Sequence, residues 1–425
     1  MHLTRPLFAA VAACCALTHV GCNERDADST PETTLASRQE GGADDVWISV
    51  DRDVLPTLER LGVRAPRVYG LERAGAPAAV RVPREVLPAL ADAAHEEHGR
   101  CGGFMLHDDE ADAVQTVDAA DLVPYQTASA GYRVDNGAAV TALTSVLREE
   151  SLLTVLKKLV SYPTRHHASA TGLEAARYIQ STWAELAKGR SDATAALITH
   201  TRTKQPSPSL TIRGSKYPDE HVILGGHMDS IAMRGNVAPG ADDNASGIAT
   251  LTEIARAVLS TGFVPERTVT FYAYAAEEVG LIGATEIATQ AKTKGLKVLG
   301  VMQYDMVNYT IAREPYVALI KDNTNAALNT FSETLIRTYL NVPFKYLTCG
   351  YGCSDHAAWH ARGFPATFPH EALMSEDSSK FIHTATDTLD RSSNAAKHAM
   401  LFARFGVAFV AELAKGSVPA AGSTR

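Results

Sequence analysis

Residues 221–229 read HVILGGHMD, an apolar run that ends in a histidine, a methionine and an aspartate. A short apolar run of this kind is typical of a buried strand, and we expect one over residues 222–225. In open α/β sheets, ligands bind beyond the carboxyl ends of the strands. His227 and Asp229 follow this strand directly. The stretch therefore predicts a sheet of this class with a functional site at the strand end.

Two further acidic clusters stand at comparable positions. Asp242-Asp243-Asn244 lies in a turn before a helix predicted at residues 246–259, and Glu277-Glu278 follows a strand predicted at residues 268–273. Helix capping explains one acid of the first cluster but not two. Adjacent glutamates after a buried strand are costly unless they are paired or bind a cation. Together the clusters indicate a hydrolytic site with two metal ions.

Two more residues complete a set of ligands. Asp305 follows an apolar strand predicted at residues 298–304, and His383 lies far downstream. Because one carboxylate can bridge two cations, we assign the bridge to Asp242 and leave Asn244 or Ser246 to cap the helix. The predicted ligands of two Zn²⁺ ions are then His227, Asp242, Glu278, Asp305 and His383.

Two acidic residues have roles other than that of a ligand. Asp229 is close enough to accept a hydrogen bond from the second ring nitrogen of His227 and so fix the tautomer. Glu277 stays free as a general base that takes a proton from water and delivers it to the leaving amine. Taken alone, a His-x-Asp pair is as often structural, so this assignment depends on the whole set.

The order of predicted elements defines the fold class. Helices are expected at residues 142–160, 172–186, 246–259, 326–340 and 395–413, and strands at 209–213, 222–225, 268–273 and 298–304. Strands separated by helices predict an α/β protein with a mixed, largely parallel sheet covered by helices on both faces. A small α+β unit is expected to precede it.

The 425 residues divide into six segments. Residues 1–22 resemble a secretory signal, and 23–45 form a tether too polar to fold. Residues 46–117 form the α+β unit, 118–140 a linker or processing region, 141–415 the catalytic domain and 416–425 a flexible tail. We therefore expect an exported protein that is extracellular, periplasmic or lipid-anchored at the cell envelope.

Charge and leader sequence limit the partners. The net charge of −8 argues against a nucleic-acid partner. Gly21-Cys22 is similar to the cleavage site of a bacterial lipoprotein, so membrane attachment is expected only through a lipid on Cys22. A small molecule or a peptide is therefore the expected substrate, and we expect a monomer.

Five separated motifs carry a resemblance to a known family. They are GGHMDS at 225–230, APGADDNASGIA at 238–249, AYAAEEVGL at 273–281, DM at 305–306 and CGYGCSDH at 349–356. In this order and spacing they resemble the secreted bacterial leucyl aminopeptidases, the co-catalytic dizinc exopeptidases of metallopeptidase family 28. The resemblance covers residues from about 146 to 413 and implies the zinc-exopeptidase, phosphorylase/hydrolase-like fold.

The resemblance also implies roles for single residues. One metal would be held by His227 and Asp305, the other by Glu278 and His383, with Asp242 as bridge, Glu277 as general acid/base and a cis peptide after Asp242. Tyr351, in a loop closed by a disulfide between Cys349 and Cys353, would hydrogen-bond the substrate carbonyl or its oxyanion. The pocket for the first side chain would be lined by Tyr351, Met306, Cys349, Cys353 and Ile382. Residues 46–117 resemble the family's propeptide, with an accessory domain as the alternative.

We therefore predict an exported dizinc aminopeptidase that removes apolar, leucine-like first residues by means of a metal-activated hydroxide. The alternatives are a related zinc carboxypeptidase, a single-zinc glutaminyl cyclase and a noncatalytic surface lipoprotein with the same fold. The zinc content distinguishes the cyclase, and loss of ligands would mark the noncatalytic protein.

Overall fold

The structure is a computed structural model that describes residues 44–63, 68–70, 77–98, 103–122, 131–309, 314–372 and 379–419. The predicted signal, with Cys22, lies outside the described residues. In the part of the chain that is described, no helix is both long enough and apolar enough to cross a membrane. Residues 42–425 form one compact unit.

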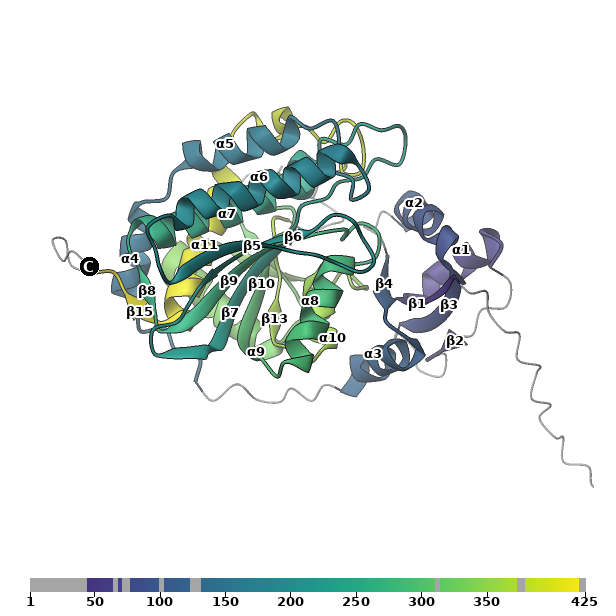
Figure 1. The fold of residues 1–425 in the computed structure, drawn as a ribbon, viewed down its shortest axis with the longest axis horizontal. Helices are drawn as coiled ribbons and strands as arrows, with labels where there is room; N and C mark the ends of the chain where they lie inside the picture. Colours follow the sequence, from purple (N-terminus) through teal and green to yellow (C-terminus); the bar gives the residue numbers. More distant parts are fainter. Residues whose placement is uncertain are drawn as a thin grey trace, which may run out of the picture. The chain divides into compact units, whose positions relative to one another are not determined.

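A six-stranded mixed sheet forms the centre of the catalytic region (Figure 1). Its order is β13-β10-β7-β9-β6-β5; β13, β10, β7 and β9 run parallel to one another, β6 runs antiparallel to β9, and β5 runs antiparallel to β6. The strands are β5 (Ala193–Ile198), β6 (Ser207–Ile212), β7 (Tyr217–His227), β9 (Arg267–Tyr274), β10 (Lys297–Gln303) and β13 (Ala366–Thr367). The last six residues of β7 are buried because β7 lies inside the sheet, between β9 and β10.

Helices cover both faces of this sheet. The apolar side chains on one face form a single core with α4 (Gly137–Ser145), α5 (Glu149–Val160), α6 (Ala170–Ala187), α7 (Gly247–Ser260), α9 (Ala326–Leu335) and α11 (Lys397–Ala414). The other face packs against α8 (Ile282–Thr293) and α10 (His356–Ala361). The predicted mixed α/β sheet with helices on both faces is confirmed.

One predicted helix is wrong. Residues 142–160 form two helices, because the chain leaves helical geometry at Arg148 (φ −134°, ψ 120°). The backbone N–H of Arg148 donates to the buried carboxylate of Glu253 on α7 at 2.6 Å. A tertiary contact therefore ends α4 and starts α5, and no local sequence signal marks this point.

Smaller elements surround the sheet. A three-stranded sheet orders β12 (Phe344–Leu347), β11 (Val317–Ile320) and β14 (Pro369–His370), and β8 (Val264–Pro265) pairs with β15 (Gly416–Ser417). Single 3-10 turns lie at Arg52–Val54, Arg84–Val86 and Leu389–Ser392, and a π turn lies at Ile336–Leu340. The turn at Ala241–Ser246 is not a regular helix, because Asp243 and Asn244 have non-helical backbone angles.

The N-terminal region contains a four-stranded antiparallel sheet of order β2-β3-β1-β4. Its strands are β1 (Asp45–Val50), β2 (Val68–Tyr69), β3 (Ala78–Pro83) and β4 (Phe104–His107). Alternate residues of β1 face opposite sides: Ile48 packs with α1 (Leu55–Arg60) and α2 (Leu87–His98), and Trp47 packs with α3 (Glu110–Leu122). Helix α3 thus extends past residue 117, into the stretch expected to be a linker.

Strand β4 packs against the segment that follows the two glutamates of the AYAAEEVGL motif. The N–H of Leu106 donates to the carbonyl of Gly280 at 3.1 Å, and Phe104 shares an apolar cluster with Ala276 and Ile282. The N-terminal sheet therefore supports the backbone next to the candidate site.

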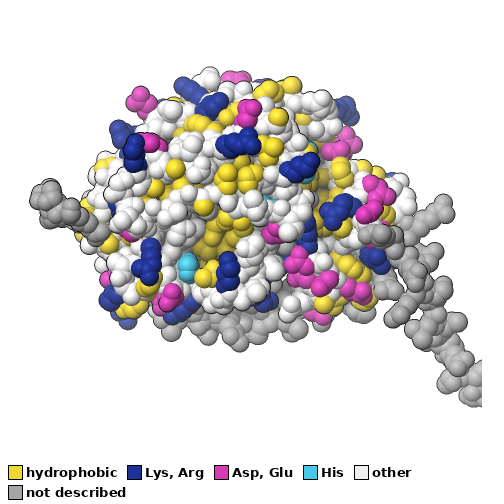
Figure 2. All heavy atoms as spheres, in the orientation of Figure 1, with side chains coloured by type: hydrophobic (Ala, Val, Ile, Leu, Met, Phe, Trp, Pro, Cys, Tyr) yellow, Lys and Arg dark blue, Asp and Glu magenta, His cyan; other side chains and the backbone are white. Residues whose placement is uncertain are grey.

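Figure 2 shows acidic side chains gathered over α3, where Asp108, Asp109 and Asp118 are exposed.

Candidate metal centre

Five buried side chains from separate elements meet beyond the carboxyl ends of the parallel strands. His227 ends β7, Asp243 lies in the turn before α7, Glu278 follows β9, Asp305 follows β10, and His383 lies before the 3-10 turn at Leu389. They form two groups, His227 with Asp243 and Asp305, and Asp243 with Glu278 and His383. In each group the possible ligand atoms lie within 4.8 Å of one another. The strand-end positions predicted from the sequence do converge.

Asp243 belongs to both groups and connects them. Its Oδ1 lies 3.0 Å from Nε2 of His227, and its Oδ2 lies 3.1 Å from Nε2 of His383. The same histidine nitrogens approach the outer carboxylates, at 3.2 Å for Asp305 and 2.9 Å for Glu278. Each group thus offers one imidazole and two carboxylates, one of them shared.

The prediction that Asp242 is the bridge is wrong in this geometry. Oδ1 of Asp242 accepts hydrogen bonds from the backbone N–H groups of Asn308 (3.1 Å) and Tyr309 (3.2 Å). The backbone at Asp243 is nearly extended (φ −107°, ψ 93°), and successive side chains of an extended chain point to opposite sides. Only Asp243 therefore reaches the two histidines. The cis peptide is likewise displaced by one residue and joins Asp243 to Asn244.

Asn244 caps the following helix, in agreement with one of the two capping residues suggested by the sequence. Its Oδ1 accepts the N–H of Gly247 at 2.9 Å, and its Nδ2 donates to the carbonyl of Tyr304 at 2.8 Å. Ser246 instead donates its hydroxyl to the carbonyl of Asp242 at 2.7 Å. The turn is thereby attached to the backbone beside Asp305.

Asp229 holds the two glutamates. Its carboxylate accepts the backbone N–H groups of Glu277 (3.0 Å) and Glu278 (3.3 Å), and its Oδ1 lies 3.6 Å from Nδ1 of His227. The distance to His227 is long for a hydrogen bond, so the main contacts of Asp229 are to the backbone. Burial raises the pKa of Asp229, but the nearby imidazole of His227 and the backbone N–H of Glu277 outweigh burial and lower the pKa below its ordinary value.

The glutamates differ in their surroundings. Burial raises the pKa of Glu278 to about 7, and the charge of Asp243 adds to this effect. Burial also raises the pKa of Glu277 well above its ordinary value, against the lowering effect of His227. Oε2 of Glu277 is buried and has no hydrogen-bond partner among the described residues. Glu277 is not in either ligand group, which agrees with a free base.

The residues present fit a pair of zinc ions. Both carboxylate oxygens of Glu278 are buried without a hydrogen bond in the described part of the chain, although Glu278 lies against His383. Buried carboxylates packed this closely need a compensating positive charge. Imidazole and carboxylate ligands, with three per metal and one shared, are a donor set that Zn²⁺ accepts.

Outer contacts orient Asp305. The hydroxyl of Ser354 donates to Oδ2 of Asp305 at 2.6 Å, and Gln303 on β10 donates to both Ser354 (2.9 Å) and Asp355 (3.0 Å). Burial raises the pKa of Asp355 well above its ordinary value. His356 packs its ring against Phe368, with centroids 4.8 Å apart, and burial lowers its pKa to about 3.

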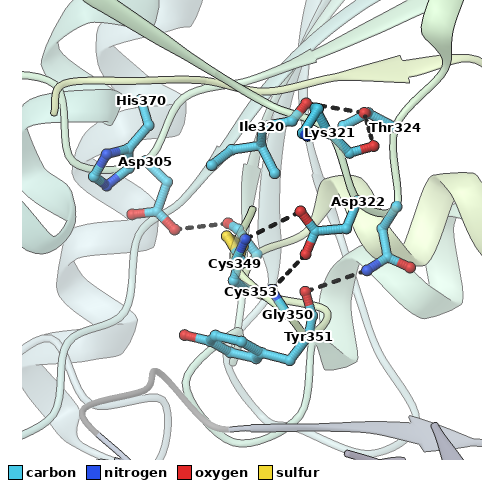
Figure 3. The surroundings of a disulfide bond; sticks show 12 residues. Asp305, Ile320, Lys321, Asp322, Thr324, Cys349, Gly350, Tyr351, Cys353 and His370 are labelled. Carbon is cyan, nitrogen blue, oxygen red and sulfur yellow. Dashed lines mark hydrogen bonds between the residues drawn. A yellow bond between two sulfur atoms is a disulfide. The ribbon is translucent and has the colours of Figure 1, made fainter. Parts of the chain in front are cut away.

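The predicted disulfide between Cys349 and Cys353 is present. Asp322 braces its loop by accepting the N–H groups of Cys349 (3.0 Å) and Gly350 (2.6 Å). In Figure 3 the phenol of Tyr351 extends from this loop toward the side on which Asp305 lies. Tyr351, Cys353 and Phe368 form one apolar cluster, with Cys349 packed against it.

Two other residues predicted for the pocket lie beside candidate ligands. Met306 follows Asp305, is buried and has a left-handed backbone (φ 53°). Ile382 precedes His383 and is half-buried. Their contact with a substrate stays a prediction.

Sequence reasoning missed two residues that shape the turn. Asp387 accepts the N–H groups of Asp242 (3.0 Å) and Asp243 (3.1 Å), and it lies four residues after His383. Arg165 is fully buried and donates to carbonyl groups on either side of the 229–238 segment. The only sequence signal for Asp387 was its nearness to His383, and Arg165 had none.

Comparison with known proteins places this site in context. The signature of peptidase family M28 matches residues 209–405. Leucine aminopeptidase 1 of Arthroderma otae is 36% identical over 294 residues, which cover 65% of this chain and 77% of that protein. The chain also resembles the crystal structure of the LapA aminopeptidase of Legionella pneumophila (TM-score 0.76, 27% identity, covering 87% of this chain and 98% of the other). LapB of the same organism aligns with a TM-score of 0.74 at 28% identity, covering 87% of this chain and all of the other.

Proposed function

The chain belongs to peptidase family M28, and from this premise we propose that it is a zinc aminopeptidase with two metal ions in one centre. The observation that supports two ions is the position of Asp243, whose two oxygens face two different histidines. A site for one metal would need only one of the two groups. The second group, with its own buried imidazole and outer carboxylate, would then hold no metal.

We assign the outer ligands by distance. His227 and Asp305 would hold one zinc, Glu278 and His383 the other, and Asp243 both. When bound, the ions supply Lewis acids that polarise the scissile carbonyl, activate water and take up the free amino group of the peptide. Asp229, Ser354 and Asp387 hold the backbone or side chains of the ligands in place.

Glu277 would act as general acid/base. Its Oε2 has no hydrogen-bond donor among the described residues, and the N–H bond to Asp229 fixes its backbone beside the ligands. The side chain can therefore accept a proton from water and return it to the leaving amine. Tyr351 would donate its hydroxyl to the oxygen of the substrate carbonyl as negative charge develops there.

We propose that the first residue of the substrate is apolar and leucine-like. Tyr351, the disulfide, Met306 and Ile382 would contact its side chain. Two observations support this preference. The apolar residues Ile320, Tyr351, Cys353 and Phe368 form a buried cluster near Asp305, and a related protein is the leucine aminopeptidase 1 of Arthroderma otae. A substrate pocket lined by these apolar side chains would favour binding of a branched apolar side chain.

We also propose that the protein is exported as a monomer, with residues 46–117 acting as a propeptide-like unit. Export is supported by the apolar run from Leu7 to Leu17, and lipid attachment by Gly21-Cys22. Secretion into the medium, cell fractionation and labelling with a fatty acid would distinguish a free from a lipid-anchored protein.

The activity test uses purified protein, leucine p-nitroanilide and zinc analysis by mass spectrometry. We expect two zinc ions per chain, cleavage of the free-amine substrate and no cleavage of its N-acetylated form. Glu277→Gln should keep both zinc ions while kcat falls by about 10²- to 10⁴-fold, because only proton transfer is lost. A wild-type protein that holds two zinc ions and cleaves neither this substrate nor any short peptide with a free amino terminus would contradict the proposal. One tightly bound zinc would favour the glutaminyl cyclase.

A further inference from the structure

Arg165 is a fully buried cation close to the candidate metal centre. All four hydrogen bonds that its guanidinium donates to described residues go to main-chain carbonyls, those of Met228 (2.9 Å), Gly240 (2.9 Å), Leu159 (3.4 Å) and Pro239. A buried charge is costly unless neighbouring groups offset it. Because its bonds are all to backbone, we expect the role of Arg165 to lie in the chain segments that it joins.

Two of these segments carry candidate ligands. Met228 directly follows His227, and Gly240 stands three residues before Asp243. One planar guanidinium thus joins the end of β7 to the start of the turn, with Nε on one segment and its terminal nitrogens on the other. Arginine suits this task because its donors are fixed in a rigid fork.

The main chain of Arg165 is attached to the same place. Its N–H donates to the hydroxyl of Ser230 at 3.0 Å, and that hydroxyl donates to the carbonyl of Ala238 at 2.8 Å. The N–H of Ala238 donates to the carbonyl of Pro163 at 2.7 Å. Three segments, at residues 163–165, 228–230 and 238–240, therefore form one connected network.

Gly240 leaves the space that the guanidinium occupies. It has a left-handed backbone (φ 52°), and a Cβ at this position would lie 2.3 Å from the carbonyl oxygen of Asp243 and 2.8 Å from Nη2 of Arg165. The close approach of Arg165 to the turn thus depends on a residue with no side chain.

The charge of Arg165 acts on the carboxylates of the centre. Burial lowers its pKa to about 10, while Asp387, Asp243, Asp229 and Glu278 oppose this effect. The guanidinium therefore stays charged at neutral pH and interacts electrostatically with these four acids, two of which are candidate ligands. It offsets part of their mutual repulsion in the metal-free protein.

We propose that Arg165 is a positioning residue of the metal centre, which fixes Asp243 relative to His227 by clamping the backbone segments beside them. The inference rests on the proposed dizinc centre. Arg165 contacts neither substrate nor metal in this role, and it acts through the geometry of the ligands. Loss of an outer group of this kind typically lowers metal affinity by about 10- to 100-fold.

The test measures zinc affinity of the full chain by competition with a chelator, and unfolding of the metal-free protein by urea. Arg165→Met removes charge and donors at similar volume, and Arg165→Lys keeps the charge but has no fork to span both segments. Arg362→Met is the matched control, because Arg362 is also buried but bonds to Asp112 (2.8 Å) and Thr289 (3.1 Å), outside the centre.

We expect both Arg165 variants to bind zinc about 10- to 100-fold more weakly than wild type, and the control to bind like wild type even where it unfolds more easily. Wild-type zinc affinity in Arg165→Met and Arg165→Lys would overturn the inference, as would an equal loss in Arg362→Met. Failure of both Arg165 variants to fold with excess zinc would make Arg165 a general folding residue and also overturn it. If wild-type protein itself does not bind two zinc ions, the proposed function fails instead.

Discussion

Asp242 and Asp243 are neighbours in sequence with opposite surroundings. Asp243 faces both histidines, whereas Asp242 accepts the backbone N–H groups of Asn308 and Tyr309. The motif predicts that an acid at this turn bridges two metals. Which of the two aspartates forms the bridge depends on the dihedral angles at Asp243, and composition and spacing do not define these angles. The site was thus predictable to within one residue.

The first prediction compares these two acids. Asp243→Asn should lose bound zinc, and kcat/KM for leucine p-nitroanilide should fall by about 10³-fold or more, since the shared ligand is removed. Asp242→Asn keeps an oxygen that can accept the same backbone N–H groups, so it should hold two zinc ions. Zinc analysis and steady-state kinetics check both, and the reverse order of effects would restore the bridge to Asp242.

At the scale of elements, β7 shows how a strand is fitted to its neighbours. A Cβ at Gly225 would lie 2.2 Å from the ring of Tyr274 on β9, and one at Gly226 would lie 2.5 Å from the carbonyl oxygen of Tyr304. The paired glycines before His227 therefore allow the ring of Tyr274 on β9 and the backbone of Tyr304, directly after β10, to approach β7. His227 is held in position by this packing.

The second prediction follows from that packing. Gly226→Ala should lower the free energy of unfolding by about 1–3 kcal/mol, because backbone cannot yield to the added methyl group. Gly137→Ala, at the first residue of α4, meets nothing closer than 3.6 Å and should be neutral or slightly stabilising. Urea unfolding of metal-free protein checks both, and equal effects would show that crowding at β7 is not the cause.

Most elements were predictable because their signals are local. Strands β6, β7, β9 and β10 each contain a predicted strand segment, although β7 begins at Tyr217, five residues before the predicted run, and the order of strands and helices predicts a mixed, largely parallel sheet. The break at Arg148 was not predictable, since it depends on Glu253 more than 100 residues away. The positions of Arg165 and Asp387 likewise depend on contacts between distant segments.

At the scale of the whole molecule, the N-terminal sheet and the catalytic region share polar contacts as well as apolar ones. Asp112 on α3 accepts hydrogen bonds from Nδ1 of the buried His107 (3.0 Å) and from Arg362 (2.8 Å). Burial raises the pKa of Asp112, but these two partners outweigh burial and lower it to about 2. The ionised form of Asp112 therefore stabilises the folded chain.

The third prediction concerns pH. Because the folded pKa lies below the unfolded value of 3.8, the contribution of Asp112 is complete above about pH 4 and is lost as pH falls through about 2. Asp112→Asn should cost about 2 kcal/mol at pH 7 and roughly half of that at pH 3. Urea unfolding with a chelator at pH 7, 5 and 3 measures the difference, so that zinc release does not contribute.

Asp109→Asn is the control for this change. Asp109 is exposed in the same segment and accepts the N–H of Asp112, a cap that asparagine preserves. Its effect should be small at all three pH values. A difference between Asp112→Asn and wild type that does not vary with pH would assign the loss to packing and not to charge.

The two ligand groups also differ in when they are complete during synthesis. His227, Asp243 and Asp305 are all present once the chain reaches residue 305, whereas the group of Asp243 and Glu278 needs His383, which is synthesised 78 residues later. Because the chain is made from its amino terminus, one set of ligands exists before the other is complete. The order of synthesis therefore allows the first group to assemble while the second still lacks its imidazole.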